Sequence, residues 1–250
     1  ANTQPQQFID EEENYSLDFD GNNDSAYRNG VSGANFSSTN QITIEAYFKL
    51  DNNQAHDGIV SMNASSGGCC AYRLMLFNNQ IFYNAGQHSD RYITSFTFNN
   101  NTWYHYVMVV NGGGNATFYV NGDQVHSSSS GVPSVLPNPT KLFIGTGESP
   151  NAHRFNGMID EVRIWNTARS QGEIQSTMGS PLTGNESGLV AYYNFQEGSG
   201  TSAQDQSGNG NNITIYGANY IPNGAPINNF IISDNCPNDA NADQLDYDGD

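Results

Sequence analysis

The residues best suited to chemistry are the acids near the end of the chain, in residues 234–250. Six of these seventeen residues are Asp, and Asp246, Asp248 and Asp250 alternate with other residues. A hard cation such as calcium prefers several oxygen ligands at once, and a D-x-D-x-D run brings carboxylates to one point as the backbone curls around the ion. The spacing predicts a calcium site made of these three carboxylates. The alternative is a solvated acidic tail, because like charges without a core repel one another.

The same stretch resembles the start of a thrombospondin type 3 repeat. It carries the sequence DNCP at residues 234–237, followed by Asn, Gln and Asp residues in the order of that family. The resemblance implies calcium binding and a location outside the cell, either secreted or at the cell surface. It also implies that Cys236 pairs with a cysteine of a following repeat. We therefore expect a fragment of a larger secreted protein, with other domains of that protein as partners.

A second oxygen-rich segment, DGNND, lies near the start of the chain. Asp20, Asn22 and Asp24 offer alternating oxygen atoms in a turn that contains glycine, and such a turn suits calcium. The alternative is an Asx turn, in which the Asp and Asn side chains bond to their own backbone.

Basic and aromatic side chains gather in three segments that we expect to be loops, at residues 67–73, 83–92 and 149–155. Three of the six Arg residues lie there. Aromatic rings stack on the C–H faces of sugars, and Arg binds carboxylate or sulfate oxygens in pairs. Alternatively, the Tyr residues pack inside the sheets and the Arg residues solubilise loops. If the loops meet, they form a carbohydrate site made of Tyr72, Arg73, Tyr83, His88, Arg91, Tyr92, His153 and Arg154.

Two cysteines, Cys69 and Cys70, are adjacent in the first of these segments. Neighbouring Cα atoms lie about 3.8 Å apart, which is closer than the roughly 4.4–6.8 Å that disulfides prefer, so a bridge between them is strained. An oxidising compartment favours the bridge all the same. Two free thiols are the alternative.

The charge of the chain excludes one class of partner. The formal net charge is −17, and even residues 14–233 hold 15 acids against 8 bases, which leaves −7. Nucleic acid binding needs a basic stripe, and the sequence has none. No apolar run approaches the roughly 18 residues of a membrane span.

Catalysis has little support in the sequence. Asp160 and Glu161 are adjacent, so on a strand they would point to opposite faces and could not act as the carboxylate pair of a glycosidase. No zinc spacing, phosphate-binding loop or nucleophile elbow occurs. His88, Arg91 and Tyr92 could remove a proton beside a uronate carboxylate, which keeps a polysaccharide lyase as an alternative.

Alternating hydrophobicity predicts strands throughout the chain. In residues 41–50 the even-numbered positions are apolar, which predicts a strand with one face in the core and one face exposed to solvent. Residues 103–110 are apolar on both faces, as is typical of an inner strand. Residues 116–125 predict a hairpin, since Asn121 and Gly122 tolerate the positive φ of its turn. Residues 188–195 predict the last strong strand.

The segment from Met158 to Trp165 predicts another alternating strand, with Ile159, Glu161, Arg163 and Trp165 on one side. A short helix should follow, because Ser170 and Glu173 have the spacing of a capping box. Many short strands separated by Gly, Asn and Pro turns predict an all-β, two-sheet antiparallel jelly-roll sandwich with one short helix. Trp103 and Trp165 are expected to be core residues, and the DQSGNG stretch at 205–210 is expected to be a turn.

Three blocks then resemble the laminin G-like, concanavalin A-type jelly-roll domain of bacterial extracellular proteins. They are LDFDGNNDSAY at 17–27, FNGMIDEVRIWNTARSQGEIQSTM at 155–178 and GNESGLVAYYNFQEGSGTSAQDQSGNGNNITIYGA at 184–218. The resemblance implies that Asp160 approaches the DGNND turn and contributes to its calcium. It divides the chain into an acidic leader (1–13), the jelly-roll domain (14–222), a linker (223–233) and the truncated thrombospondin repeat (234–250).

The sequence therefore predicts a noncatalytic carbohydrate-binding module of a secreted bacterial polysaccharide-degrading enzyme or adhesin. Its partner would be an extracellular polysaccharide, including an anionic one, and its cofactor would be calcium. A protein-binding adhesion domain and a jelly-roll polysaccharide lyase are the alternatives, because one fold carries all three functions.

Overall fold

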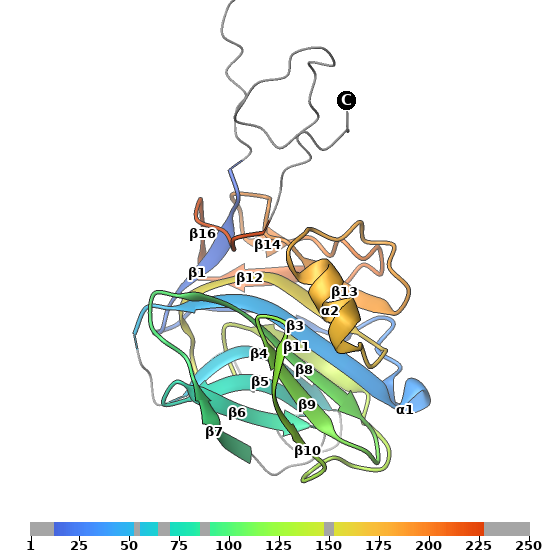
Figure 1. Ribbon diagram of the computed structural model, residues 1–250. Helices are drawn as coiled ribbons and strands as arrows, with labels where there is room; N and C mark the ends of the chain where they lie inside the picture. The colour runs from blue at the N-terminus through green and yellow to red at the C-terminus, as the bar shows by residue number, and fades with distance from the viewer. Residues whose placement is uncertain (1–12, 53–55, 65–70, 86–90, 148–152, 228–250) are drawn as a thin grey trace, which may run out of the picture.

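The computed structural model describes residues 13–52, 56–64, 71–85, 91–147 and 153–227. In these ranges the chain forms two antiparallel sheets that pack face to face (Figure 1), which confirms the predicted all-β sandwich. Two short helices accompany the sheets, where the sequence predicted one. They are α1 (Phe36–Thr39) and α2 (Gln171–Met178).

The first sheet, sheet A, has the order β10-β9-β8-β3-β12-β1-β16, and β13 also pairs with β12. Its strands are β1 (Ser16–Asp20), β3 (Gln41–Leu50), β8 (Trp103–Asn111), β9 (Ala116–Val120), β10 (Asp123–Ser128), β12 (Asn156–Trp165), β13 (Leu189–Tyr193) and β16 (Asn219–Ile221).

The second sheet, sheet B, has the order β14-β15-β2-β11-β4-β5-β6-β7. Its strands are β2 (Ser25–Asn29), β4 (Asp57–Ala64), β5 (Tyr72–Phe77), β6 (Gln80–Ala85), β7 (Arg91–Thr97), β11 (Pro139–Ile144), β14 (Ser202–Ala203) and β15 (Ile213–Tyr216).

The hydrophobic core lies between the sheets, and period-two alternation explains its composition. Strand β3 sends Ile42, Ile44 and Phe48 into the core, all fully buried, because successive side chains of a strand point to opposite faces. The hairpin of β9 and β10 also forms as predicted, with positive φ at Asn121 and Gly122.

Strand β12 departs from the predicted alternation. Its pairing with β3 shifts register between Asp160 and Arg163, and Glu161 adopts a φ of 50°. This bulge inserts an extra residue and reverses which side chains face inward. Ile159, Val162 and Ile164 therefore line the core, so the expected single face of Ile159, Glu161, Arg163 and Trp165 is wrong. Trp165 is buried on the far side of the sheet, against Leu189 and Tyr192.

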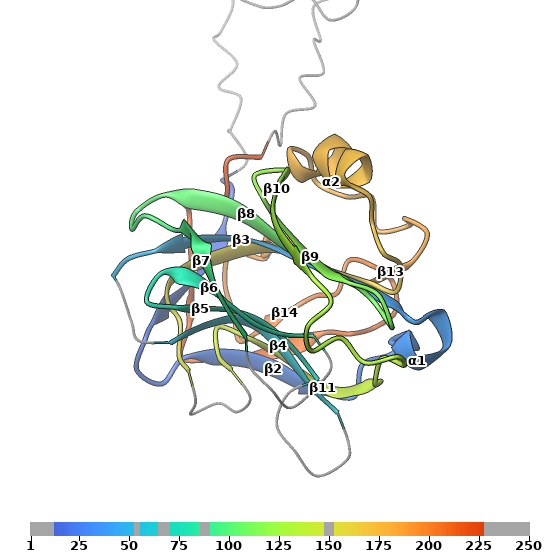
Figure 2. The same ribbon diagram turned by 60° about the horizontal axis from the view of Figure 1, so that its bottom comes forward.

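The outer face of sheet A is covered by helix α2 (Figure 2). The predicted capping box is present: the Ser170 side chain accepts from the Glu173 backbone, and the Glu173 side chain accepts from the Ser170 backbone. Ile174 packs against Val107, Val109 and Tyr119 of the sheet. The amphipathic helix thus buries its one fully enclosed side chain on β8 and β9.

Buried charges lie beneath α2. The Glu45 carboxylate accepts from Arg169 at 2.9 Å and lies 3.2 Å from His105 Nε2. The guanidinium of Arg163 donates to Glu161 and to the Thr177 carbonyl, at 2.5 and 2.9 Å. Burial alone would raise the pKa of Glu45, but His105, Arg163 and Arg169 together lower it to about 2. The Glu45 carboxylate is therefore charged and joins α2 to the sheet.

Residues 222–227 form a second cover on sheet A, which we call the C-terminal strap. The Ala225 amide donates to the Asp160 carboxylate at 2.8 Å. Ala225 and Ile227 pack against Tyr47, with Trp103 beside them and only partly buried. The folded unit therefore includes residues 223–227, the beginning of the segment that we expected to be a linker.

Candidate functional site

The structure places two of the eight expected carbohydrate-binding residues in the core. Tyr72 and Tyr83 are 0% and 2% exposed and belong to the cluster between the sheets. The Tyr72 hydroxyl donates to the Pro137 carbonyl at 2.8 Å, and the Tyr83 ring packs against Phe118. Neither ring can stack on a sugar in this conformation, so their assignment to a binding surface is corrected to a packing role.

Arg73 points to the opposite side, onto the outer face of sheet B, where it is 3% exposed. Strand β4 holds the chain on either side of the next predicted loop, since the Gly58 amide donates to the His153 carbonyl and the Ser61 hydroxyl donates to the Thr146 carbonyl. His153 and Arg154 are partly buried. Arg73 therefore lies on the outer face of sheet B but is almost completely buried.

The remaining predictions for this cluster are only partly described. Arg91 and Tyr92 lie on β7, and their backbones pair with Tyr83 and Phe82. His88, Cys69 and Cys70 fall outside the described residues, so the disulfide between the two cysteines and the lyase alternative stay predictions.

The DGNND turn has the geometry of an Asx turn. The Asn22 amide donates to the Asp20 carboxylate at 2.8 Å, and the Asp20 amide donates to the Asp24 carboxylate at 2.9 Å. The first of these bonds lowers the pKa of Asp20. Calcium at this turn remains a prediction, and so does calcium at Asp246, Asp248 and Asp250, which fall outside the described residues.

Asp160 does not join that turn. In the register of β1 and β12, Asp20 lies opposite Asn156, and Asp160 follows four residues later, about 13 Å along the strand. Its carboxylate accepts instead from the amides of Glu161 and Ala225. Among the described residues, no group of three or more His, Cys, Asp or Glu side chains is arranged to hold a metal. The expected ligand role of Asp160 at the turn is therefore wrong.

A row of aligned side chains crosses the outer face of sheet B. This face lies on the side of the sandwich away from α2 (Figure 2). Residues from six neighbouring strands lie directly opposite one another there. Paired residues share a face of the sheet, so they form one continuous row, which is aromatic at the β2 side and polar towards β6. The row consists of Thr214, Tyr27, Phe143, Ser61, Arg73 and Asn84.

The aromatic end of this row is open to solvent. The rings of Tyr27 and Tyr216 are stacked, with centroids 4.9 Å apart and planes 14° apart, and Phe143 lies 5.6 Å from Tyr27 on the other side. Tyr216 is 46% exposed, although it is a large aromatic residue. The Tyr216 hydroxyl shares a hydrogen bond with Tyr27, and this bond raises the pKa of Tyr216 because it favours the protonated phenol.

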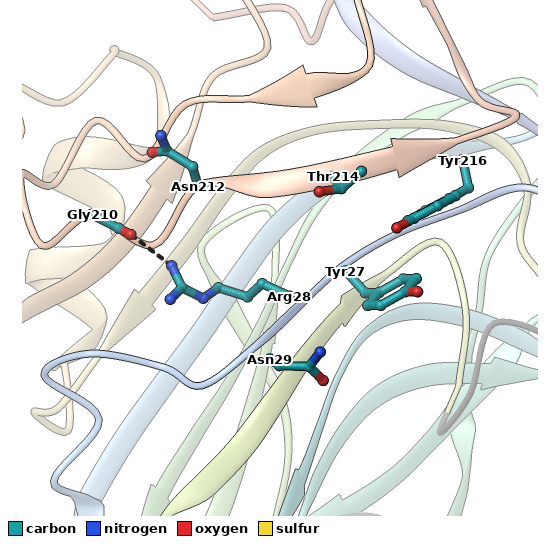
Figure 3. Close-up of a pocket in the computed structure, with 7 residues that line it drawn as sticks. All are labelled: Tyr27, Arg28, Asn29, Gly210, Asn212, Thr214 and Tyr216. Atoms are coloured by element: carbon teal, nitrogen blue, oxygen red, sulfur yellow. Dashed lines mark hydrogen bonds between the residues drawn. The ribbon is translucent and has the colours of Figure 1, made fainter.

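A pocket of about 400 Å³, lined by residues of the paired strands β2 and β15 and of the turn before β15, lies beside this stack (Figure 3). Its wall is polar apart from the two rings. We call it the tyrosine pocket, and it is lined by Tyr27, Arg28, Asn29, Gly210, Asn212, Thr214 and Tyr216.

Arg28 lines the pocket, and its side chain extends towards Gly210 with the guanidinium held by two backbone carbonyls (Figure 3). Its Nε donates to Gly30 at 2.5 Å, and its terminal nitrogen donates to Gly210 at 2.7 Å. The predicted turn at 205–210 positions Gly210, because the Asp205 carboxylate accepts from the amides of Ser207 and Asn211. The turn at residues 205–210 therefore fixes the position of the Gly210 carbonyl, and through it the orientation of the Arg28 guanidinium.

Comparison with known proteins identifies the class of this fold. A laminin G profile of the concanavalin A-like lectin/glucanases superfamily matches residues 19–175. The match covers more than half of the chain, so the chain belongs to that superfamily. No curated protein is similar enough in sequence to count as a relative.

Solved structures show the same fold at low sequence identity. A protein from Bacteroides ovatus to which carbohydrate binding is ascribed superposes with a TM-score of 0.68 at 20% identity, over 86% of this chain and 61% of that chain. A heptameric SAP-like pentraxin from Limulus polyphemus superposes with a TM-score of 0.55 at 15% identity, over 66% of this chain and 81% of that one. Trypanosoma rangeli sialidase superposes with a TM-score of 0.51 at 18% identity, over 66% of this chain and 27% of the sialidase chain.

The chain thus spans about three fifths of the Bacteroides protein and about a quarter of the sialidase. Neither helix in the described part of the chain is long and apolar enough to cross a bilayer.

Proposed function

We propose that this jelly roll is a noncatalytic carbohydrate-binding module of a secreted bacterial enzyme or adhesin, and that it holds an extracellular polysaccharide at the tyrosine pocket. The observation that carries the proposal is the exposed stack of Tyr216 on Tyr27. An aromatic face offers a sugar ring a flat apolar surface, while the hydroxyl and amide groups around it can bond to the sugar hydroxyls.

Polar side chains around the stack, together with a similar fold in a known protein, support the proposal. The side chains of Asn29, Asn212 and Thr214 are exposed around the stack and supply both donors and acceptors. The Bacteroides ovatus protein with the same fold is described as carbohydrate-binding. Calcium in the DGNND turn would be a structural cofactor of the module, measurable as a melting temperature that falls on addition of EDTA and changes less in Asp20→Asn.

Affinity electrophoresis against a panel of algal and plant polysaccharides tests the proposal. Tyr216→Ala should abolish most of the retardation that the unmodified chain shows, because stacking is worth about 1–3 kcal/mol in comparable aromatic contacts. Tyr216→Phe should keep most of the binding, since the ring remains.

Val135→Ala is the control, because Val135 is the other large exposed apolar residue of the described chain, at 60% exposure. This variant should bind like the unmodified chain. A chain that no polysaccharide retards, or one that binds equally well with Tyr216→Ala, would overturn the proposal. The first of those results would favour a protein-binding adhesion domain.

A further inference from the structure

Arg28 contributes a positively charged side chain to the lining of the tyrosine pocket. Its two hydrogen bonds go to backbone carbonyls, and it makes no ion pair within the described part of the chain. The buried Arg163 and Arg169, in contrast, each contact a carboxylate of Glu161 or Glu45. An arginine held in place without a counter-ion leaves a full positive charge on a pocket wall.

The guanidinium group of Arg28 is also held in one orientation before any ligand binds. A guanidinium carries five N–H donors, and the bonds to Gly30 and Gly210 use two of them. The remaining donors have a fixed orientation, which lowers the conformational entropy that a ligand must remove on binding. Such a fork matches the paired oxygens of a carboxylate or a sulfate ester.

A second cation lies beside the pocket. Lys141 on β11 is exposed and pairs with Asn29, one of the lining residues. It makes no ion pair with a described residue either. Only eight Lys and Arg residues occur in a chain whose net charge is −17, and two of them lie on the neighbouring strands β2 and β11 at this pocket.

We propose that the tyrosine pocket selects acidic sugars, namely residues that carry a carboxylate or a sulfate group. The sugar ring lies on Tyr216, and the anionic group of the same or the next residue meets Arg28. The proposal rests on the proposed carbohydrate-binding function and adds the ligand class and the residue that selects it. The pocket extends from Tyr216 to Asn212, four residues or about 13 Å along β15, which gives room for more than one sugar ring.

Binding of the full chain to three probes tests this inference. Polygalacturonate supplies carboxylates, carrageenan supplies sulfates, and laminarin is neutral. Arg28→Gln should weaken binding to the preferred acidic polymer at least tenfold and leave laminarin binding within about twofold. Arg28→Lys, which keeps the charge and loses the fork, should give an intermediate loss. Raising the salt from 0.05 to 0.5 M should weaken acidic binding by the unmodified chain and should have much less effect on Arg28→Gln, because the screening length between exposed charges falls from about 14 Å to about 4 Å over this range.

Lys49→Gln is the matched control. It removes one positive charge from β3 of the other sheet, where Lys49 lies over the Trp103 ring, so it changes the net charge equally and should leave acidic binding unchanged. Melting temperatures of all variants show whether each one folds.

The outcomes separate the two proposals. The unmodified chain could bind laminarin as tightly as both acidic polymers, with only Tyr216→Ala losing binding. That result would overturn the acidic selectivity and leave the carbohydrate-binding function standing. Equal losses with Arg28→Gln and Lys49→Gln would also overturn it, because the effect would then be one of net charge. Failure to bind any of the three probes would count against both proposals.

Discussion

At the scale of single residues, the Glu45 carboxylate determines how the fold responds to acid. Its pKa is about 2 in the folded chain against an ordinary value of 4.5. A carboxylate whose pKa is lowered by folding stabilises the folded state above its unfolded pKa and loses that contribution as the pH falls through the folded pKa. The contribution is about 3 kcal/mol at neutral pH and should disappear between pH 4.5 and 2.

We expect Glu45→Gln to remove this part of the acid dependence. At pH 7 the variant should lose about 3–5 kcal/mol of unfolding free energy, since the buried Arg169 then lacks its partner. Between pH 4.5 and 2 its stability should fall less steeply than that of the unmodified chain. Denaturant unfolding at several pH values measures both effects.

Glu197→Gln is the corresponding control, because Glu197 is partly exposed and the amide oxygen of glutamine can still accept from the Gln204 amide, while the Tyr220 hydroxyl keeps its bond to the Ser202 carbonyl. It should change stability by less than about 0.5 kcal/mol and keep the original slope. Identical slopes for Glu45→Gln and the unmodified chain would show that Glu45 titrates normally.

The sequence could identify residue types but not their neighbours. Tyr27 and Tyr216 are far apart in the chain, and only the pairing of β2 with β15 brings their rings together. The alternation of Ile213 and Ile215 in the core with exposed Thr214 and Tyr216 was a usable signal. The sequence analysis places Tyr72 and Tyr83 at the ends of expected loops and therefore on a binding surface. In the structure both residues lie within strands, β5 and β6, and period-two alternation directs both rings into the core.

At the scale of elements, β12 depends on a glycine. Gly157 has a φ of +137°, and a Cβ atom there would lie 2.1 Å from the Lys49 carbonyl oxygen. That contact is with the backbone of the paired strand β3, which cannot move without disturbing the centre of sheet A.

Gly157→Ala should therefore lower the unfolding free energy by at least about 2 kcal/mol, from backbone strain and steric overlap together. Gly172→Ala in α2 is the matched substitution, because nothing lies within 4 Å of the added carbon and the backbone is already helical. It should raise stability by about 0.5–1 kcal/mol. Thermal unfolding would contradict the explanation if both substitutions shifted the melting temperature in the same direction.

Most elements could be predicted, and the exceptions have physical reasons. The capping box at Ser170 and the alternation of β3 are local signals that packing reinforces. The bulge in β12 has no local signal, because the residue with positive φ is Glu161 and not Gly or Asn. Side-chain hydrogen bonds hold it there: Tyr192 from the neighbouring strand and Arg163 from the same strand both donate to the Glu161 carboxylate.

At the scale of the whole molecule, the C-terminal strap should define where the folded unit ends. A chain that ends after residue 227 keeps the strap, and a chain that ends after residue 222 loses Ala225 and Ile227 together with the hydrogen bond to Asp160. We expect the shorter chain to lose about 2–5 kcal/mol relative to the longer one, through lost apolar burial and the loss of one of the two backbone hydrogen bonds to the buried Asp160 carboxylate.

Calorimetry of the two truncated chains and the full chain measures this difference. The chain ending at residue 227 serves as the control, since it removes only residues beyond the strap. Equal melting temperatures for both truncations would place the end of the folded unit at residue 222.

The two ends of the described chain meet at one edge of sheet A (Figure 1). The Gly224 amide donates to the Asn14 carbonyl, and Ser16 pairs with Ile221 in the ladder of β1 and β16. A tensile force that pulls these ends apart acts across that ladder at one end and opens its hydrogen bonds in sequence, as in unzipping, without loading them all together in shear. The strap and β16 would be the first to detach under load, while the tyrosine pocket on the other sheet keeps its shape.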